Sequence, residues 1–142
     1  MYADEFKASE GVVDPIAQRN IFSTNPTTEG TNYARNFFCE AICTSCSSAP
    51  SLLLLAVLVR TFLLLAICVG LIVWAVGMGM GGITGFAMNQ ARDLGPRIAY
   101  QVLPIKNKAD NNWKYGLLVP GIAPFVGAAL AALFVHGFLG MF

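Results

Sequence analysis

The chain has 142 residues, of which 56% are hydrophobic and only 12% are charged, and its mean hydropathy is +0.61. This composition is a poor match to a water-soluble domain. Nine Lys and Arg residues against eight Asp and Glu give a net charge of +1, which argues against a nucleic-acid partner and against a polybasic patch on a membrane surface.

Residues 1–35 are polar and contain turn signals at Asp14-Pro15, Asn25-Pro26 and Glu29-Gly30. They lack the apolar stretch of a signal peptide. We therefore expect an extramembrane loop over 1–35, followed by a membrane domain over 36–142.

Three apolar runs in the membrane domain predict membrane-spanning helices near 36–59, 61–81 and 115–138. Residues 61–80 alone contain twenty positions without a charge, about the length of one span. Arg60 is expected in a tight turn between the first two helices, and Pro50 interrupts the first of them. Glu40 is a carboxylate near or inside the membrane, and two interpretations remain open: a structural or functional hub, or an interfacial residue near the headgroups.

The first span also carries Cys43 and Cys46 in a C-x-x-C spacing. Such a pair occurs in redox and zinc sites, but the sequence has no second pair, and its one histidine, His136, lies near the opposite end. Membrane packing is therefore the favoured role for the cysteines. We expect no metal, no cofactor and no enzymatic activity.

Small residues recur at four-residue spacing from the end of the second predicted span into the following stretch, and again within the third span, which is typical of helices that approach closely in membranes. They form two series, Gly77, Gly81 and Gly85, then Ala123, Gly127 and Ala131.

The stretch GITGFAMNQARDLGPR, residues 82–97, places a glycine-punctuated apolar run before a polar helix start. Asn89 can cap a short helix over about 89–102, and Arg92 and Asp93 fall in its first turn. An arginine here is unlikely to face lipid, and the free N–H groups of such a helix point at whatever lies in front of it. Broken helices at membrane depth persist where they pack in protein or line a watery cavity. The stretch predicts a pore or a binding site.

These residues resemble the second signature of the major intrinsic protein family, in its glycerol-facilitator branch, which reads approximately GFAMNPARDxGPR. The match covers eleven positions: Gly85, Phe86, Ala87, Met88, Asn89, Ala91, Arg92, Asp93, Gly95, Pro96 and Arg97. Gln90 departs from the family, which has proline there. The stretch Phe22–Pro26 resembles the FSTxP of the long outer loop of glycerol facilitators, so the chain is expected to hold the C-terminal half of the family fold.

The resemblance implies half of an inverted-repeat channel, with about three membrane helices and one re-entrant half-helix whose tip is formed by Asn89, Gln90 and Ala91. Phe86 and Arg92 would form the selectivity filter. The carbonyl groups of Gly85, Phe86, Ala87 and Met88 would line the pore, and Glu40 would support that loop.

The resemblance also implies the setting: a multi-pass protein of the cell membrane, in contact with the lipid bilayer, that passes glycerol or similar polyols and water. The complete family fold is a homo-tetramer, and the partner implied for this chain is the missing N-terminal half of the channel.

Four residues favour the glycerol branch over water-only members: Asp93, Arg97, Pro120 and Gly121. A simpler alternative for the first two is an ion pair at i and i+4 of one helix.

Two features stand against a channel that works alone. The family builds its pore from two half-helices that meet tip to tip, and one is present here. Gln90 lacks the preorganised backbone of proline at the first helical position. The alternative is a small structural or interaction membrane protein, or a degenerate channel remnant, without transport.

Overall fold

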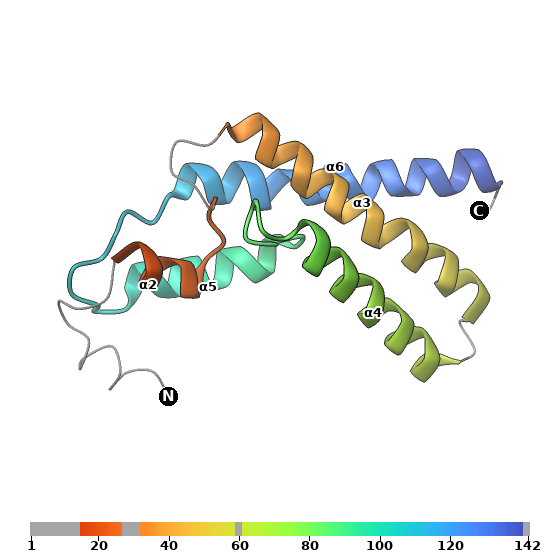
Figure 1. Cartoon of the computed structure of the whole chain (residues 1–142), viewed down its shortest axis with the longest axis horizontal. Helices are drawn as coiled ribbons and strands as arrows, with labels where there is room; N and C mark the ends of the chain where they lie inside the picture. Colours follow the sequence, from red (N-terminus) through yellow and green to blue (C-terminus); the bar gives the residue numbers. More distant parts are fainter. Residues whose placement is uncertain (1–14, 27–31, 59–60, 141–142) are drawn as a thin grey trace.

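The computed structural model describes residues 15–26, 32–58 and 61–140, and the regular structure within these ranges is entirely helical (Figure 1). The helices in chain order are α2 (Pro15–Phe22), α3 (Tyr33–Leu58), α4 (Phe62–Met80), α5 (Gln90–Val102) and α6 (Trp113–Leu139). The predicted all-α fold is confirmed.

Three of these helices, α3, α4 and α6, are long and apolar enough to cross a membrane. Their candidate spans are Tyr33–Val57, Phe62–Met80 and Trp113–Gly137. These agree with the predicted spans, while the turn expected at Arg60 lies outside the described residues. Helix α5 begins where the short helix was predicted; its 13 residues extend roughly 20 Å, less than the thickness of a bilayer core.

Pro50 does not end or divide α3, which runs without interruption from Tyr33 to Leu58. Proline removes one backbone hydrogen bond, but helices in membranes tolerate it where neighbouring groups satisfy the freed carbonyl. The prediction that Pro50 breaks the helical pattern was therefore wrong. Helix α6 continues in the same way through Pro120 and Pro124.

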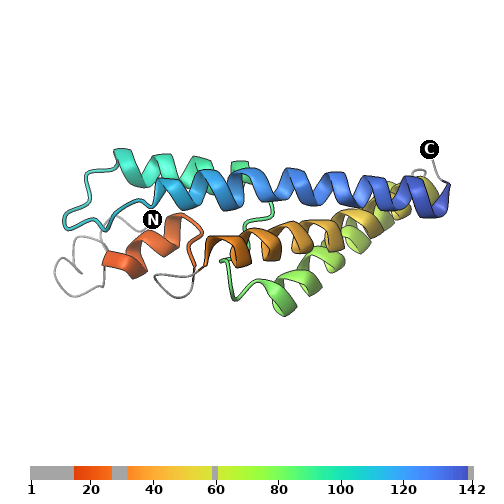
Figure 2. The same cartoon turned by 90° about the horizontal axis from the view of Figure 1, so that it is seen from above.

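The packed core of the molecule lies between α3 and α6, which run side by side (Figures 1 and 2). A Cβ atom on Gly127 would stand only 2.8 Å from Cβ of Thr44, so glycine is what allows α6 to approach α3 this closely. Ser45 reinforces the contact because its hydroxyl donates to the carbonyl of Gly127 at 2.8 Å. Ala123 and Ala131 are buried on the same face. The close-packing face predicted on α6 is confirmed.

Helix α4 leaves this core at an angle (Figure 1). Among the described helices it contacts α3, and none of its own residues is buried. The four-residue spacing predicted that Gly77 and Gly81 pack against another helix. Among the described residues they pack against the side chain of Phe86 instead. A Cβ atom on Gly77 would instead lie 2.8 Å from the ring of Phe86, and one on Gly81 would lie 3.0 Å from Cβ of Phe86. The glycines form a notch for an aromatic side chain.

Within the described residues 15–26, the segment before α3 forms a helix that the turn signals did not predict. Helix α2 lies against α5, and the ring of Phe22 is 5.4 Å from the ring of Tyr100. Arg19 is buried and donates to the carbonyl of Asp110 at 3.1 Å. Part of the predicted loop over 1–35 is thus folded onto the α5 end of the molecule.

Candidate functional site

The short helix α5 begins as its sequence predicts. Asn89 has an extended backbone, with φ −153°, and its side-chain oxygen accepts a hydrogen bond from the Ala91 N–H at 2.9 Å. This is an N-cap, and it leaves the amide N–H₂ of Asn89 exposed at the helix tip. Gln90 opens the helix, and its amide nitrogen lies 3.7 Å from the position that a Cβ on Gly121 would take. The tip of α5 therefore contacts α6.

The four residues before the tip form an irregular strip with an unusual backbone. Gly85, Phe86 and Met88 have φ values of +83°, +58° and +46°, in the left-handed region that glycine alone adopts readily. The N–H of Phe86 donates to Thr84 and the N–H of Met88 donates to Glu40, and the Phe86 side chain packs against Gly77 and Gly81. Strained conformations of this kind are typical of functional sites, where the surrounding structure stabilises them.

All four backbone N–H groups of this strip donate into the protein. Gly85 donates to the Gly81 carbonyl at 3.1 Å, and Phe86 to the hydroxyl of Thr84 at 3.4 Å. Ala87 and Met88 donate to the two carboxylate oxygens of Glu40, at 3.1 and 2.9 Å. Within residues 15–26, 32–58 and 61–140 no donor contacts the carbonyl oxygens of the strip. They are its free polar groups.

Glu40 is fully enclosed, with 1% of its surface exposed. Besides the two N–H groups, it accepts a hydrogen bond from the hydroxyl of Thr84, whose carbonyl accepts from Tyr115 at 3.2 Å. Of the two interpretations left open by the sequence, the interfacial one does not describe this carboxylate. It is a buried acceptor for three donors from the segment ahead of α5.

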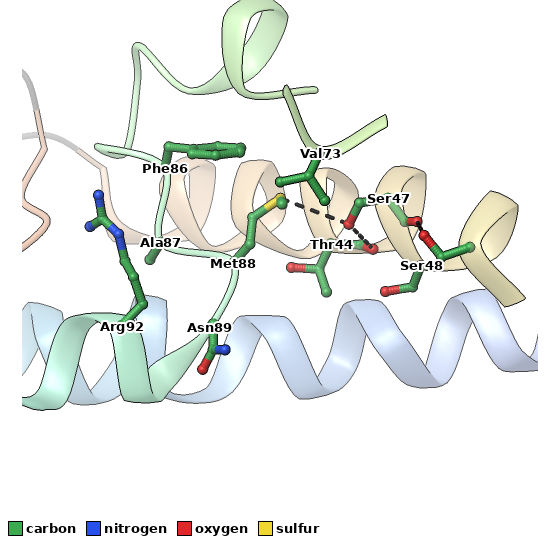
Figure 3. Close-up of a pocket in the computed structure, with 10 residues that line it drawn as sticks. Thr44, Ser47, Ser48, Val73, Phe86, Ala87, Met88, Asn89 and Arg92 are labelled. Atoms are coloured by element: carbon green, nitrogen blue, oxygen red, sulfur yellow. Dashed lines mark hydrogen bonds between the residues drawn. The ribbon is translucent and has the colours of Figure 1, made fainter. Parts of the chain in front are cut away.

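An open groove of about 460 Å³ runs along this strip (Figure 3). It is bounded by α3, α4, the strip and the first turn of α5. Its lining residues are Thr44, Ser47, Ser48, Ser51, Val73, Phe86, Ala87, Met88, Asn89 and Arg92.

Arg92 and Phe86 lie at one end of the groove, Asn89 and Met88 follow, and Ser48 lies beyond them (Figure 3). Arg92 is exposed and makes no hydrogen bond or ion pair with any described residue, so its guanidinium donors are available to a solute. The groove thus offers charged and amide donors, carbonyl acceptors and an apolar aromatic face.

The other predicted site residues lie outside the groove. Asp93 and Arg97 form a buried ion pair at 2.7 Å, the alternative that the i, i+4 spacing suggested. The pair also binds remote segments, since Asp93 accepts from the N–H and hydroxyl of Thr24, while Arg97 donates to the carbonyls of Thr24 and Asn111. We call these four residues the arginine clamp. They join the segment after α2 to α5 and to the start of α6.

Glycine lets α6 fit this clamp: a Cβ on Gly116 would collide with the Arg97 guanidinium. Pro120 and Gly121 are buried one turn further along α6. The four residues that marked the glycerol branch therefore lie behind the groove and contribute to the packing that positions α5.

Sequence reasoning missed the α3 wall of the groove. Thr44, Ser47, Ser48 and Ser51 have the i, i+3, i+4, i+7 spacing of one helical face, a signal that was present in the sequence. Among the described residues no group of three or more His, Cys, Asp or Glu side chains is placed to hold a metal ion. The cysteines of α3 and α4 are free thiols.

Comparison with known proteins agrees with this arrangement. The profile of the family described as Major intrinsic protein matches residues 8–135. The chain is 57% identical to Glycerol uptake facilitator protein 4 and 55% identical to D/L-lactic acid transporter, both from Lactiplantibacillus plantarum, with 99% of this chain and 58% of each relative covered. It is 38% identical to Glycerol uptake facilitator protein of Bacillus subtilis, over 95% of this chain and 47% of that protein.

The chain thus spans about half the length of the curated relatives it matches. The match to the family profile covers most of the 142 residues and includes the strip, the tip of α5, the first two candidate spans and all but the last two residues of the third. This chain belongs to the major intrinsic protein family.

Proposed function

We propose that the chain supplies the second half of a channel that passes glycerol, related small uncharged solutes and water. The observation that carries the proposal is the composition of the groove: the unengaged guanidinium of Arg92 and the amide of Asn89 line the same space as the ring of Phe86 and the residues Ala87 and Met88 of the strip. A selective channel must replace a solute's hydration without binding it tightly, and this set of groups can do so for a polyol.

Each group has a distinct task in this mechanism. Arg92 donates hydrogen bonds to solute oxygens, and its charge repels cations. The carbonyls of the strip accept from solute hydroxyls, while Phe86 provides a face for the carbon skeleton. Asn89 donates at the tip of α5, where the positive end of the helix dipole adds to the barrier against cations and protons. Glu40 holds the strip so that its carbonyls face the groove.

The names of two relatives support a solute class of small, hydroxylated and uncharged molecules. One is named for glycerol uptake and another for lactic acid. Glycerol and protonated lactic acid share adjacent oxygen groups on a three-carbon skeleton.

A closed path requires a second half-helix opposite α5, as in other inverted-repeat membrane proteins. The groove described above is open on that side, and Arg92 and Asn89 are exposed there. We therefore infer that the 142 residues conduct only together with a complementary N-terminal half, in the tetrameric assembly of the family and in the cell membrane.

Vesicle permeability tests both parts of this proposal. The 142-residue chain alone should leave glycerol and water permeability at the lipid background, and co-reconstitution with a family-type N-terminal half should raise glycerol permeability well above it. Glycerol flux through the chain alone would contradict the need for a second half. A folded two-part complex without glycerol flux would contradict the channel function and favour a structural role.

A further inference from the structure

Helix α3 presents a row of hydroxyl groups to the groove. Thr44, Ser47, Ser48 and Ser51 all line it, and together they span about 10 Å along the helix axis. We call these four residues the hydroxyl row. Ser45, the remaining serine in this stretch of α3 between them, faces α6 instead and bonds to Gly127.

Most of the protons in the hydroxyl row are already engaged. Thr44 donates to the Glu40 carbonyl at 2.8 Å, Ser47 to the Thr44 carbonyl at 3.0 Å, and Ser51 to the Ser47 carbonyl at 2.6 Å. A hydroxyl group has one proton and two lone pairs, so these three side chains present acceptors to the groove. Such bonds to the preceding turn are common in apolar helices, but they do not require the four residues to share a face.

The hydroxyl row begins beside Met88, the last residue of the strip 85–88. The hydroxyl oxygen of Ser47 lies 3.9 Å from the sulfur of Met88, the last residue before the tip of α5. Figure 3 shows Ser47 and Ser48 beyond Met88, on the side away from Arg92. Ser51 lies one helical turn further toward Leu58. A solute that passes Asn89 therefore moves from carbonyl acceptors to hydroxyl acceptors.

We propose that the hydroxyl row is a second acceptor wall that selects neutral solutes with two or more adjacent O–H groups. Such a solute can donate to the next acceptor before it leaves the last one, so it stays solvated along the wall. A monoalcohol has one proton to donate, and a carboxylate anion has none, while three of the four hydroxyl groups already donate their own protons to backbone carbonyls. The inference rests on the proposed function in one respect, namely that the groove is the solute path.

Binding to the full 142-residue chain in detergent micelles tests the wall without requiring conduction. The reporter is the ¹³C-methyl resonance of Met88, assigned with the M88L variant and followed during titration with glycerol. The test variant combines T44V, S47A, S48A and S51A. The matched control is S45A, which removes a hydroxyl from the same helix outside the groove. 1-Propanol has the same carbon count as glycerol with one hydroxyl.

Glycerol should shift the Met88 resonance of the wild-type chain, and the fourfold variant should bind it about three- to tenfold more weakly, as expected for the loss of one or two net hydrogen bonds. S45A should stay within about twofold of wild type, and 1-propanol should not distinguish the proteins. Equal glycerol affinity of wild type and fourfold variant would overturn the proposal, as would a wild-type chain whose Met88 resonance does not respond to glycerol.

Should the fourfold variant fail to fold, the single variants T44V and S48A allow the same comparison of glycerol affinity, each with an expected loss of about twofold.

Flux through the two-part complex separates this inference from the proposed function. A conducting complex whose glycerol-to-water permeability ratio is unchanged by the fourfold variant rejects the wall and keeps the channel. A complex that binds glycerol at Met88, binds it more weakly in the fourfold variant and does not conduct rejects the channel and keeps the hydroxyl row only as a glycerol-binding wall.

Discussion

Helices α6 and α4 are both apolar enough to span a membrane, but α6 is partly buried against other helices and α4 is not. In the span of α6, 44% of the most apolar stretch is buried, whereas the span of α4 is more apolar and none of its most apolar stretch is buried. Hydropathy therefore identifies a span without saying what covers it. The two helices differ in what their glycines contact. Gly127 of α6 lies against the backbone of α3, whereas Gly77 of α4 and the adjoining Gly81 lie against a single side chain, Phe86.

The packed side, formed by α3, α6 and the arginine clamp, should determine the stability of the fold. The open side, formed by α4 and the groove, should determine what passes. Paired substitutions on the two sides test this division.

The largest difference in the free energy of unfolding is expected between substitutions of two arginines of α5. Replacing Arg97 with leucine should lower the free energy of unfolding by about 3–5 kcal/mol, because the carboxylate of Asp93 would stay buried without its partner. The matched change Arg92→Leu, at an exposed position, should stay within about 0.5 kcal/mol. Reversible unfolding in mixed micelles measures both. Similar losses for the two variants would contradict the division.

A smaller contrast is expected for two glycines. Gly127→Ala should destabilise by about 1–3 kcal/mol, because the new Cβ meets the backbone of Ala41 and the side chain of Thr44. Gly79→Ala on α4 meets nothing within 4 Å and should be neutral or slightly stabilising. The same unfolding assay applies. A destabilising Gly79→Ala would mean that α4 packs against more than the described contacts.

Glu40 lies between the two sides, and Glu40→Gln should lower stability by about 1–3 kcal/mol because one backbone donor of the strip loses its acceptor. Amide hydrogen exchange gives a local measurement. Exchange at Ala87 and Met88 should accelerate, while the N–H of Thr24, which donates to Asp93, should exchange at its original rate. Equal acceleration at all three would indicate global loosening instead of a local role for Glu40.

The smallest effects on stability, and the most specific effects on permeation, are expected in the groove. In a pore completed with a family-type N-terminal half and carrying Gln90→Pro, Arg92→Ala should admit larger polyols and urea and weaken cation exclusion, because it removes both bulk and charge from a low-dielectric neck. Phe86→Ala should relax the size limit and leave charge exclusion intact. Vesicle swelling in a polyol series with parallel proton-leak measurements compares them. Equal proton leak from the two variants would remove Arg92 from its assigned role.

Sequence reasoning predicted the helices well because their signals are local. The spans follow from uninterrupted apolar runs, and the start of α5 follows from the capping chemistry of Asn89. The prediction at Pro50 was wrong, because a membrane helix stabilised by tertiary contacts continues through a proline that would end a helix in a soluble protein.

The site was only partly predictable for a different reason. Phe86 through Arg92 are contiguous, so the motif delivered one wall of the groove. The arginine clamp joins residues that are 69 and 73 positions apart in the chain, Thr24 to Asp93 and Thr24 to Arg97, and no local pattern contains that pairing. The spacing of Gly77 and Gly81 predicts a helix contact, but the ring of Phe86 fills this notch, and spacing alone does not say which group packs against a glycine.

The burial of Glu40 also constrains the order of assembly. Its three donors, at Thr84, Ala87 and Met88, follow it by 44 to 48 residues and are therefore synthesised later. Until they arrive, α3 carries an uncompensated carboxylate, which hydrocarbon accommodates poorly. We therefore expect the first span of this chain to be held less firmly in the bilayer before the strip packs against Glu40 than after it.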